Sequence, residues 1–217
     1  MKRILFFLSI AVLMTACGGK DKINFTESDL IGTWAHVKSV NAYGDVSENL
    51  QVTIVLTANH ELVEYFSSTY DTGTWELNGR EFSSGEDKAT ITQLDGTHLV
   101  MTRQAKEGTY TDTYFKMESL MVGTWTISWT LGTSQYASFN ANGTSSWQNA
   151  ISGQDMGTPN WTVGVDEHWC RPAIIYSGSG WDEKDTIMRI EENGNLLRAI
   201  DINGTSGNYV RGHLTIQ

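Results

Sequence analysis

One short phrase occurs twice in this chain of 217 residues, and it constrains the fold more than any other feature. Residues 27–34 read Glu-Ser-Asp-Leu-Ile-Gly-Thr-Trp, and residues 118–125 read Glu-Ser-Leu-Met-Val-Gly-Thr-Trp. Trp34 and Trp125 are 91 positions apart, close to half of the chain that follows the N-terminal leader. The repeat predicts two copies of one fold, the first over residues 27–117 and the second over residues 118–217.

Short alternating segments joined by tight turns fill both copies. Residues 51–57 alternate apolar and polar side chains, as a half-buried strand does. Asn78-Gly79, Asp95-Gly96 and Asn193-Gly194 are strong signals for hairpin turns. No segment is long enough for a helical crossover, so consecutive strands must pair antiparallel. We therefore expect an all-β chain with little helix, folded as two tandem small up-and-down β-barrels.

The N-terminus has the order of features of a secretory leader. Lys2 and Arg3 precede an apolar stretch over residues 4–14, which is too short to span a bilayer, and Thr15-Ala16-Cys17 follows. This order resembles the lipobox of bacterial lipoproteins. The resemblance implies that residues 1–16 are a cleaved signal peptide, that Cys17 carries acyl chains, and that residues 17–26 are a lipidated tether. The alternative is an ordinary signal peptide with an incidental cysteine.

Location and partners follow from this reading. The lipobox implies an anchor in the bacterial outer membrane, on its periplasmic side or, as in some Bacteroidetes lipoproteins, at the cell surface. The net charge is −10 and no basic stripe is present, which excludes nucleic acid as a partner. With Cys17 acylated, Cys170 is the one remaining thiol, so no intramolecular disulfide can form. We expect Cys170 to be a small core residue, because no neighbouring pattern would activate it as a nucleophile.

A Gly-x-Trp on the first strand, after a short helical turn and before an antiparallel meander, resembles the lipocalin and wider calycin pattern. With a lipobox and tandem copies, the chain is most similar to small lipocalin-like domains of Bacteroidetes lipoproteins. The resemblance implies that Trp34 and Trp125 each close one barrel end beneath a basic residue of a late strand, a contact worth about 0.5–2 kcal/mol. The basic candidates are Lys116 or Arg103 for Trp34, and Arg211 or Arg198 for Trp125.

Tryptophan is unevenly distributed, with six of the eight residues in the second copy. Trp129, Trp147, Trp169 and Trp181 have no tryptophan counterpart in the first copy, so the shared fold does not require them. Indole rings stack on sugar faces and line apolar pockets, which makes these four the candidate ligand-binding residues. The alternative is that they pack in the core of the barrel.

Signatures of catalysis are missing from the sequence. The five histidines are scattered without zinc-ligand spacing, and neither a phosphate-binding glycine loop nor a serine elbow is present. We expect no catalytic residue, no metal and no cofactor. Asp185-Thr186-Ile187 resembles an O-glycosylation site of Bacteroidetes.

The sequence thus favours a non-enzymatic, lipid-anchored envelope lipoprotein whose barrels bind a small apolar ligand or a glycan. The alternative is a structural or interaction module with side-chain-filled barrels that contacts another envelope protein.

Overall fold

A computed structural model describes residues 25–48, 52–66 and 69–212. The leader and Cys17 lie outside these residues, so the predicted lipidation is not part of the structure. Within the described ranges, no helix combines the length and the apolar character needed to cross a membrane. The helical structure of the described residues consists of three short segments: α1 (Glu27–Leu30), α2 (Met117–Met121) and the 3-10 turn η1 (Glu192–Gly194).

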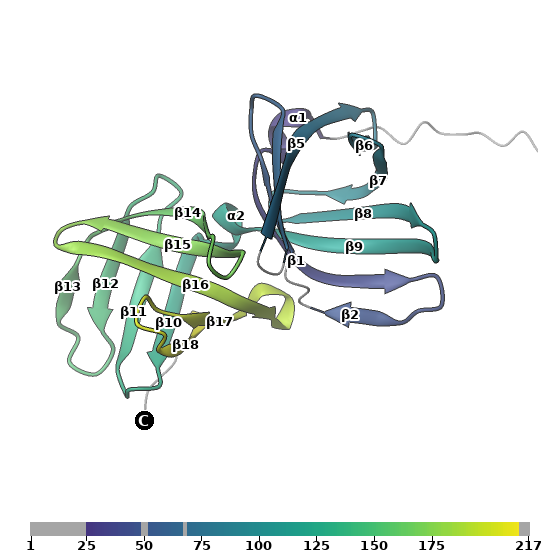
Figure 1. Cartoon of the computed structure of the whole chain (residues 1–217). Coiled ribbons are helices and arrows are strands. Elements are labelled where there is room, and N and C mark those ends of the chain that lie inside the picture. The colour runs from purple at the N-terminus through teal and green to yellow at the C-terminus, as the bar shows by residue number, and fades with distance from the viewer. Residues whose placement is uncertain (1–24, 49–51, 67–68, 213–217) are drawn as a thin grey trace, which may run out of the picture.

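Over residues 25–212, apart from the two short gaps, strands dominate and form two antiparallel sheets of nine strands each (Figure 1). The strands of the first sheet are β1 (Gly32–Asn41), β2 (Val46–Glu48), β3 (Val52–Leu56), β4 (Glu61–Phe66), β5 (Thr69–Asn78), β6 (Glu81–Ser84), β7 (Asp87–Leu94), β8 (His98–Ala105) and β9 (Gly108–Lys116). The strands of the second sheet are β10 (Gly123–Trp129), β11 (Ser134–Phe139), β12 (Ser145–Asn149), β13 (Asp155–Gly157), β14 (Asn160–Asp166), β15 (Arg171–Gly178), β16 (Trp181–Glu191), β17 (Leu196–Ile200) and β18 (Ser206–Arg211).

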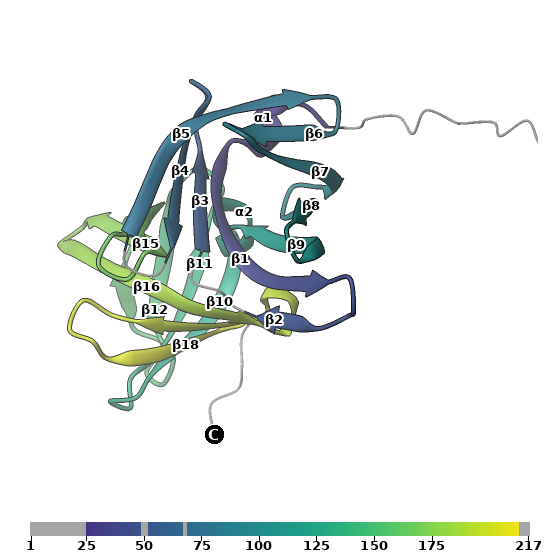
Figure 2. The same cartoon turned by 45° about the vertical axis from the view of Figure 1, so that its right-hand side comes forward.

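The first sheet closes on itself through β1. One edge of β1 pairs with β3 near its start and with β2 near its end, while the other edge pairs with β9 from Trp34 to Asn41. A bulge between His36 and Lys38 interrupts the β1–β9 register, and bulges of this kind increase local bending. The result is a closed barrel made of β1 and β3–β9, and Figure 2 shows these strands arranged as a ring.

The second sheet curls in the same sense, with β10 pairing between β11 and β18. Its outer strands approach each other at one end, where the Ser145 N–H donates to Pro159 O at 3.0 Å and the Trp161 N–H donates to Gly143 O at 2.7 Å. The equivalent bond in the first barrel joins the Trp75 N–H to His60 O at 2.9 Å. The predicted architecture of two tandem antiparallel up-and-down barrels is therefore confirmed.

The two barrels meet without a linker, because β9 ends at Lys116 and α2 begins at Met117. The apolar cluster of the second barrel extends across this junction to Ala35 and Phe115 of the first barrel. Glu118 reinforces the junction, since its carboxylate accepts a hydrogen bond from the Thr33 N–H at 2.9 Å. The first barrel has its own cluster around Trp34 and Trp75.

Candidate functional site

Each barrel is closed at one end by the tryptophan of the repeated phrase. Trp34 and Trp125 are fully buried, and their Nε1–H groups donate to Leu30 O at 2.7 Å and to Met121 O at 2.8 Å, at the ends of the preceding helical turns. The strand register places Lys116 directly opposite Trp34 and Arg211 directly opposite Trp125. Lys116 Nζ lies 5.5 Å from the Trp34 ring centroid, and the Arg211 guanidinium carbon lies 4.3 Å from that of Trp125.

The glycine of the phrase makes room for this contact. Gly32 and Gly123 have φ values of +142° and +126°, which other residues rarely adopt. A Cβ atom at Gly32 would stand 2.6 Å from the Lys116 side chain, and one at Gly123 would stand 3.0 Å from Arg211 Nη1. The structure thus brings Trp34 with Lys116, and Trp125 with Arg211, into two matching end closures. These four residues therefore have a structural role at the barrel ends.

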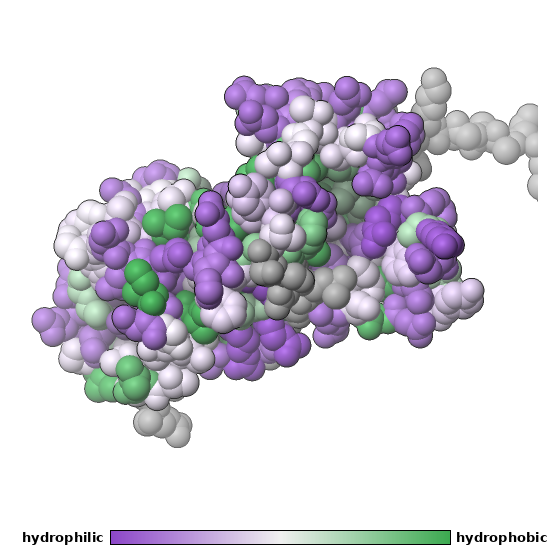
Figure 3. Space-filling model, in the orientation of Figure 1, coloured by the Kyte–Doolittle hydropathy of each residue, from purple (hydrophilic) through white to green (hydrophobic). Residues whose placement is uncertain are grey.

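A cavity of about 790 Å³ occupies the first barrel. Its buried wall is apolar and includes Ile54, Leu62, Phe82 and Met101. Its rim is exposed and charged, with residues 86–88 among its members. Figure 3 shows the corresponding recess in the first barrel, surrounded mostly by hydrophilic residues. The volume falls in the range that holds small organic ligands.

A polar network lies against this apolar wall. His36 Nε2 lies 2.9 Å from Ser39 Oγ, which donates a hydrogen bond to Asp112 Oδ1. The other carboxylate oxygen of Asp112 accepts a hydrogen bond from Arg103 Nε at 2.6 Å. All four residues line the cavity, and His36, Ser39 and Asp112 are buried. Arg103 is therefore committed to Asp112 and does not cover Trp34, which was the alternative to Lys116.

The protonation of His36 follows from this network. Burial lowers the pKa of His36 to about 4, and the nearby Arg103 and Arg171 add to the effect while Asp112 opposes it. The ring is neutral at pH 7, and since Ser39 donates to Asp112, the His36 Nε2–H must donate to Ser39. An imidazole that donates to a hydroxyl cannot also remove its proton, so the arrangement does not activate Ser39 as a nucleophile. Within the described chain, His36 Nδ1 has no hydrogen-bond partner.

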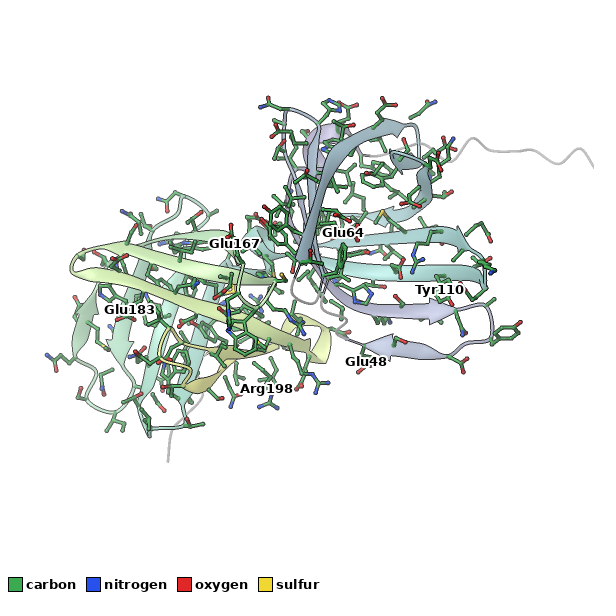
Figure 4. All side chains as sticks on the ribbon, in the orientation of Figure 1. Glu48, Glu64, Tyr110, Glu167, Glu183 and Arg198 are labelled. Carbon is green, nitrogen blue, oxygen red and sulfur yellow. The ribbon has the colours of Figure 1, made fainter. Side chains whose placement is uncertain are left out.

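Glu64 of β4, labelled in Figure 4, adds a further carboxylate to the cavity lining. Burial raises its pKa, and so do the negative charges of Asp87, Asp71 and Asp112, while Arg103 lowers it. Glu64 forms no ion pair with any residue in the described part of the chain. The cavity therefore holds a partly buried acid without a cationic partner.

The second barrel has an aromatic interior. Trp147 is buried and lies edge-on to Phe139 and Tyr176, with ring centroids 5.8 Å and 5.2 Å away. Trp181 is half-buried and packs on Trp147 at 4.9 Å. Trp161 closes the cluster against Phe139 at 5.3 Å. Trp147 and Trp181, two of the predicted ligand-binding residues, therefore pack against other aromatic side chains inside the second barrel.

The other two predicted ligand-binding residues lie elsewhere. Trp129 is half-buried at the end of β10, next to Tyr209 and over Gly207, where a Cβ atom would overlap the indole. Trp169 is 41% exposed in the loop after β14. The four predicted tryptophans therefore form no single site, and none of them lines the cavity of the first barrel. Ligand binding by any one of these four tryptophans stays a prediction.

Two polar residues that the sequence singled out in the second copy, Thr186 and Arg198, have partners within the second barrel. The Thr186 hydroxyl donates to Asp166 Oδ2 at 2.7 Å, and Thr186 is 2% exposed, so the proposed O-glycosylation hydroxyl is inaccessible in the folded chain. Asp166 also pairs with Lys184 at 2.8 Å. Arg198 pairs with Glu191 at 3.2 Å and so does not cover Trp125.

Cys170 lies at the junction of the barrels. It is 1% exposed, and its sulfur donates to Thr69 O at 3.4 Å. Burial raises the pKa of the thiol, and the charges of Asp166 and Glu167 raise it further. A thiol in this state is a poor nucleophile. In the described residues, no group of three or more His, Cys, Asp or Glu side chains is arranged to hold a metal ion.

The sequence analysis did not identify His36, Ser39, Glu64 or Asp112 as cavity residues, and it considered Arg103 only as a cover for Trp34. A signal was present, because charged residues share the inward face with apolar ones on several strands of the first copy. Asp112 lies on the same strand face as Tyr114, and Glu64 lies on the same strand face as Leu62. Charges on an otherwise apolar strand face are costly in a filled core, so they indicate solvent or ligand space inside the barrel.

Comparisons with known proteins add little to this description. No family model matches the chain, and no curated protein does. Among solved structures, the chain is similar to a protein of unknown function from the DUF3598 family of Nostoc punctiforme, with 8% sequence identity and a TM-score of 0.27. That match covers 85% of this chain and 97% of the other. A likeness of this size supports no conclusion about function.

Proposed function

We propose that this chain is a non-enzymatic, lipid-anchored lipoprotein of the bacterial outer membrane that binds a small amphipathic ligand inside its first barrel. The cavity of about 790 Å³ carries the proposal, because it combines a buried apolar wall with polar groups at fixed positions. Such a combination is typical of small-molecule sites. The proposal places the ligand in the first copy, away from the tryptophan-rich second copy.

The second barrel supports a different role, as a structural or interaction module. Its interior is packed with aromatic rings, and Leu131, Ile151 and Ile202 are 81%, 75% and 66% exposed. They lie in the β10–β11, β12–β13 and β17–β18 loops. Exposed aliphatic side chains in neighbouring loops favour contact with another envelope protein.

Isothermal titration calorimetry tests ligand binding. We expect the purified protein to bind at least one of three eight-carbon amphiphiles: octylammonium, 1-octanol or octanoate. Ala89→Trp should abolish this binding, because Ala89 lines the cavity and packs against the core of the first barrel. The matched control is Thr72→Trp, an exposed position on β5, which should bind like the wild type. Absence of heat with all three compounds, or normal binding by Ala89→Trp, would rule out this site.

Cell fractionation tests the anchor. We expect the full-length protein to sediment with bacterial outer membranes, and Cys17→Ser to move to the soluble fraction, because the substitution removes the predicted acylated thiol. Mass spectrometry of the mature N-terminus provides the independent measurement. If Cys17→Ser stays in the membrane fraction, the lipobox reading is wrong.

A further inference from the structure

The charges around the cavity of the first barrel do not balance. Five acidic residues and two cationic residues line it. The acids are Glu64, Glu81, Glu86, Asp87 and Asp112, and the cations are Lys88 and Arg103. With His36 neutral, the lining carries a formal charge of −3.

Both cations of the lining are already paired. Arg103 Nε lies 2.6 Å from Asp112 Oδ2, and Lys88 Nζ lies 3.2 Å from Glu81 Oε1. These pairs leave Glu64, Glu86 and Asp87 without a cationic partner in the described ranges. Glu86 and Asp87 are exposed and solvated, whereas Glu64 is half-buried. Desolvation makes an uncompensated charge costly, so Glu64 has the most to gain from a cationic partner.

The position of Glu64 links charge to apolar surface. Glu64 and Leu62 lie two residues apart on β4 and share its inward face, and Ile54 stands directly opposite Glu64 on β3. A molecule that lies along this wall can place a hydrocarbon segment against Leu62 and Ile54 while its polar end reaches the carboxylate. His36 belongs to the same lining and, because it is neutral, offers no positive charge to Glu64.

We infer that the cavity selects an amphipathic cation, with the alkyl part on the apolar wall and a protonated amine against Glu64. This inference rests on the proposed ligand-binding role of the first barrel and specifies its ligand class. An ammonium group supplies a positive charge and hydrogen-bond donors to the Glu64 carboxylate, which has no cationic partner among the described residues. An anionic amphiphile of the same length would add a negative charge to a lining that is already acidic.

Calorimetry with the same three eight-carbon compounds, at pH 7.5, separates charge from chain length. We expect octylammonium to bind at least about tenfold more tightly than 1-octanol, and octanoate to bind most weakly. Glu64→Gln should weaken octylammonium binding by about tenfold and leave 1-octanol binding unchanged, which also shows that the variant is folded. The matched control is Glu61→Gln on the same strand, where the side chain is exposed and points away from the interior.

The outcomes distinguish this inference from the proposed function. If 1-octanol or octanoate binds as tightly as octylammonium, or if Glu64→Gln keeps the wild-type preference, selection for a cation is overturned while ligand binding by the barrel stands. If none of the three compounds binds, the proposed function itself fails. An equal loss in Glu64→Gln and Glu61→Gln would mean that general electrostatic attraction, and not Glu64, holds the amine.

Discussion

Replacing Trp125 with alanine is expected to lower the free energy of unfolding by about 3–5 kcal/mol, the typical cost of truncating a fully buried tryptophan. Trp125 is 0% exposed, and its Nε1–H donates to Met121 O at 2.8 Å. The substitution also removes the ring beneath Arg211, whose guanidinium donates to the carbonyls of Leu120 and Val122. The indole therefore ties together β10, β18 and the helical turn α2.

Urea unfolding followed by circular dichroism measures this effect, because the signal does not depend on the number of tryptophans. Trp169→Ala is the matched control, since Trp169 is 41% exposed and its loss should change the free energy of unfolding by at most about 1 kcal/mol. A Trp125→Ala variant as stable as Trp169→Ala would show that the repeated tryptophan does not hold the barrel closed.

The second large effect concerns pH and the buried carboxyl of Asp185. Asp185 is 4% exposed, accepts a hydrogen bond from the Tyr209 hydroxyl, and through it is linked to the Tyr176 hydroxyl at 2.8 Å. Burial raises the pKa of Asp185 from 3.8 to about 7, Glu183 and Asp201 raise it further, and the tyrosine hydroxyls oppose the rise. The folded chain therefore holds this proton more tightly than the unfolded chain does.

The contribution of Asp185 to the free energy of unfolding falls as the pH rises. Protonation of Asp185 stabilises the fold fully below about pH 4, and this contribution is lost as the pH rises through about 7. The loss amounts to at most about 4 kcal/mol at about 1.4 kcal/mol per pKa unit. His36 acts in the opposite direction, because its pKa is lowered to about 4 in the folded state, so its contribution grows as the pH rises from about 4 to 6.5.

Asp185→Asn isolates the carboxyl from these opposing effects. We expect the free energy of unfolding of the variant, relative to the wild type, to increase between pH 4.5 and pH 8.5, because asparagine cannot ionise. Urea titrations at half-unit pH steps measure this difference. Asp182→Asn, an exposed position on the same strand, should show no such trend. A constant difference between wild type and Asp185→Asn at all pH values would contradict a buried titrating group at Asp185.

The architecture could be read from the sequence because its signals are local. Turn dipeptides and alternation set the strands, and the repeated phrase set the number of barrels. The pairs Trp34–Lys116 and Trp125–Arg211 could also be predicted. The resemblance implied a basic residue over each tryptophan, and the order of strands placed Lys116 and Arg211 among the candidates. Arg103 and Arg198 were open alternatives, and only the three-dimensional positions of Asp112 and Glu191 decide against them.

The cavity was harder to predict because it depends on how fully the interior is packed. Tryptophan-rich sequence suggested a site in the second copy, yet Trp147 and Trp181 fill space there instead of lining it. The first copy has only two tryptophans and places Glu64 and Asp112 on inward strand faces. Whether such charges meet solvent, a partner or a ligand depends on side chains far apart in sequence, which strand periodicity alone does not bring together.

The junction at Lys116–Met117 connects two barrels that share part of their packing. The second sequence repeat begins at residue 118, but the apolar cluster of the second barrel includes Ala35 and Phe115 from the first. Glu118 of the second copy in turn holds the backbone of Thr33. The boundary between the sequence repeats is therefore not a boundary in the hydrophobic core. A fragment that contains only one repeat would expose apolar side chains that the other repeat covers in the full chain.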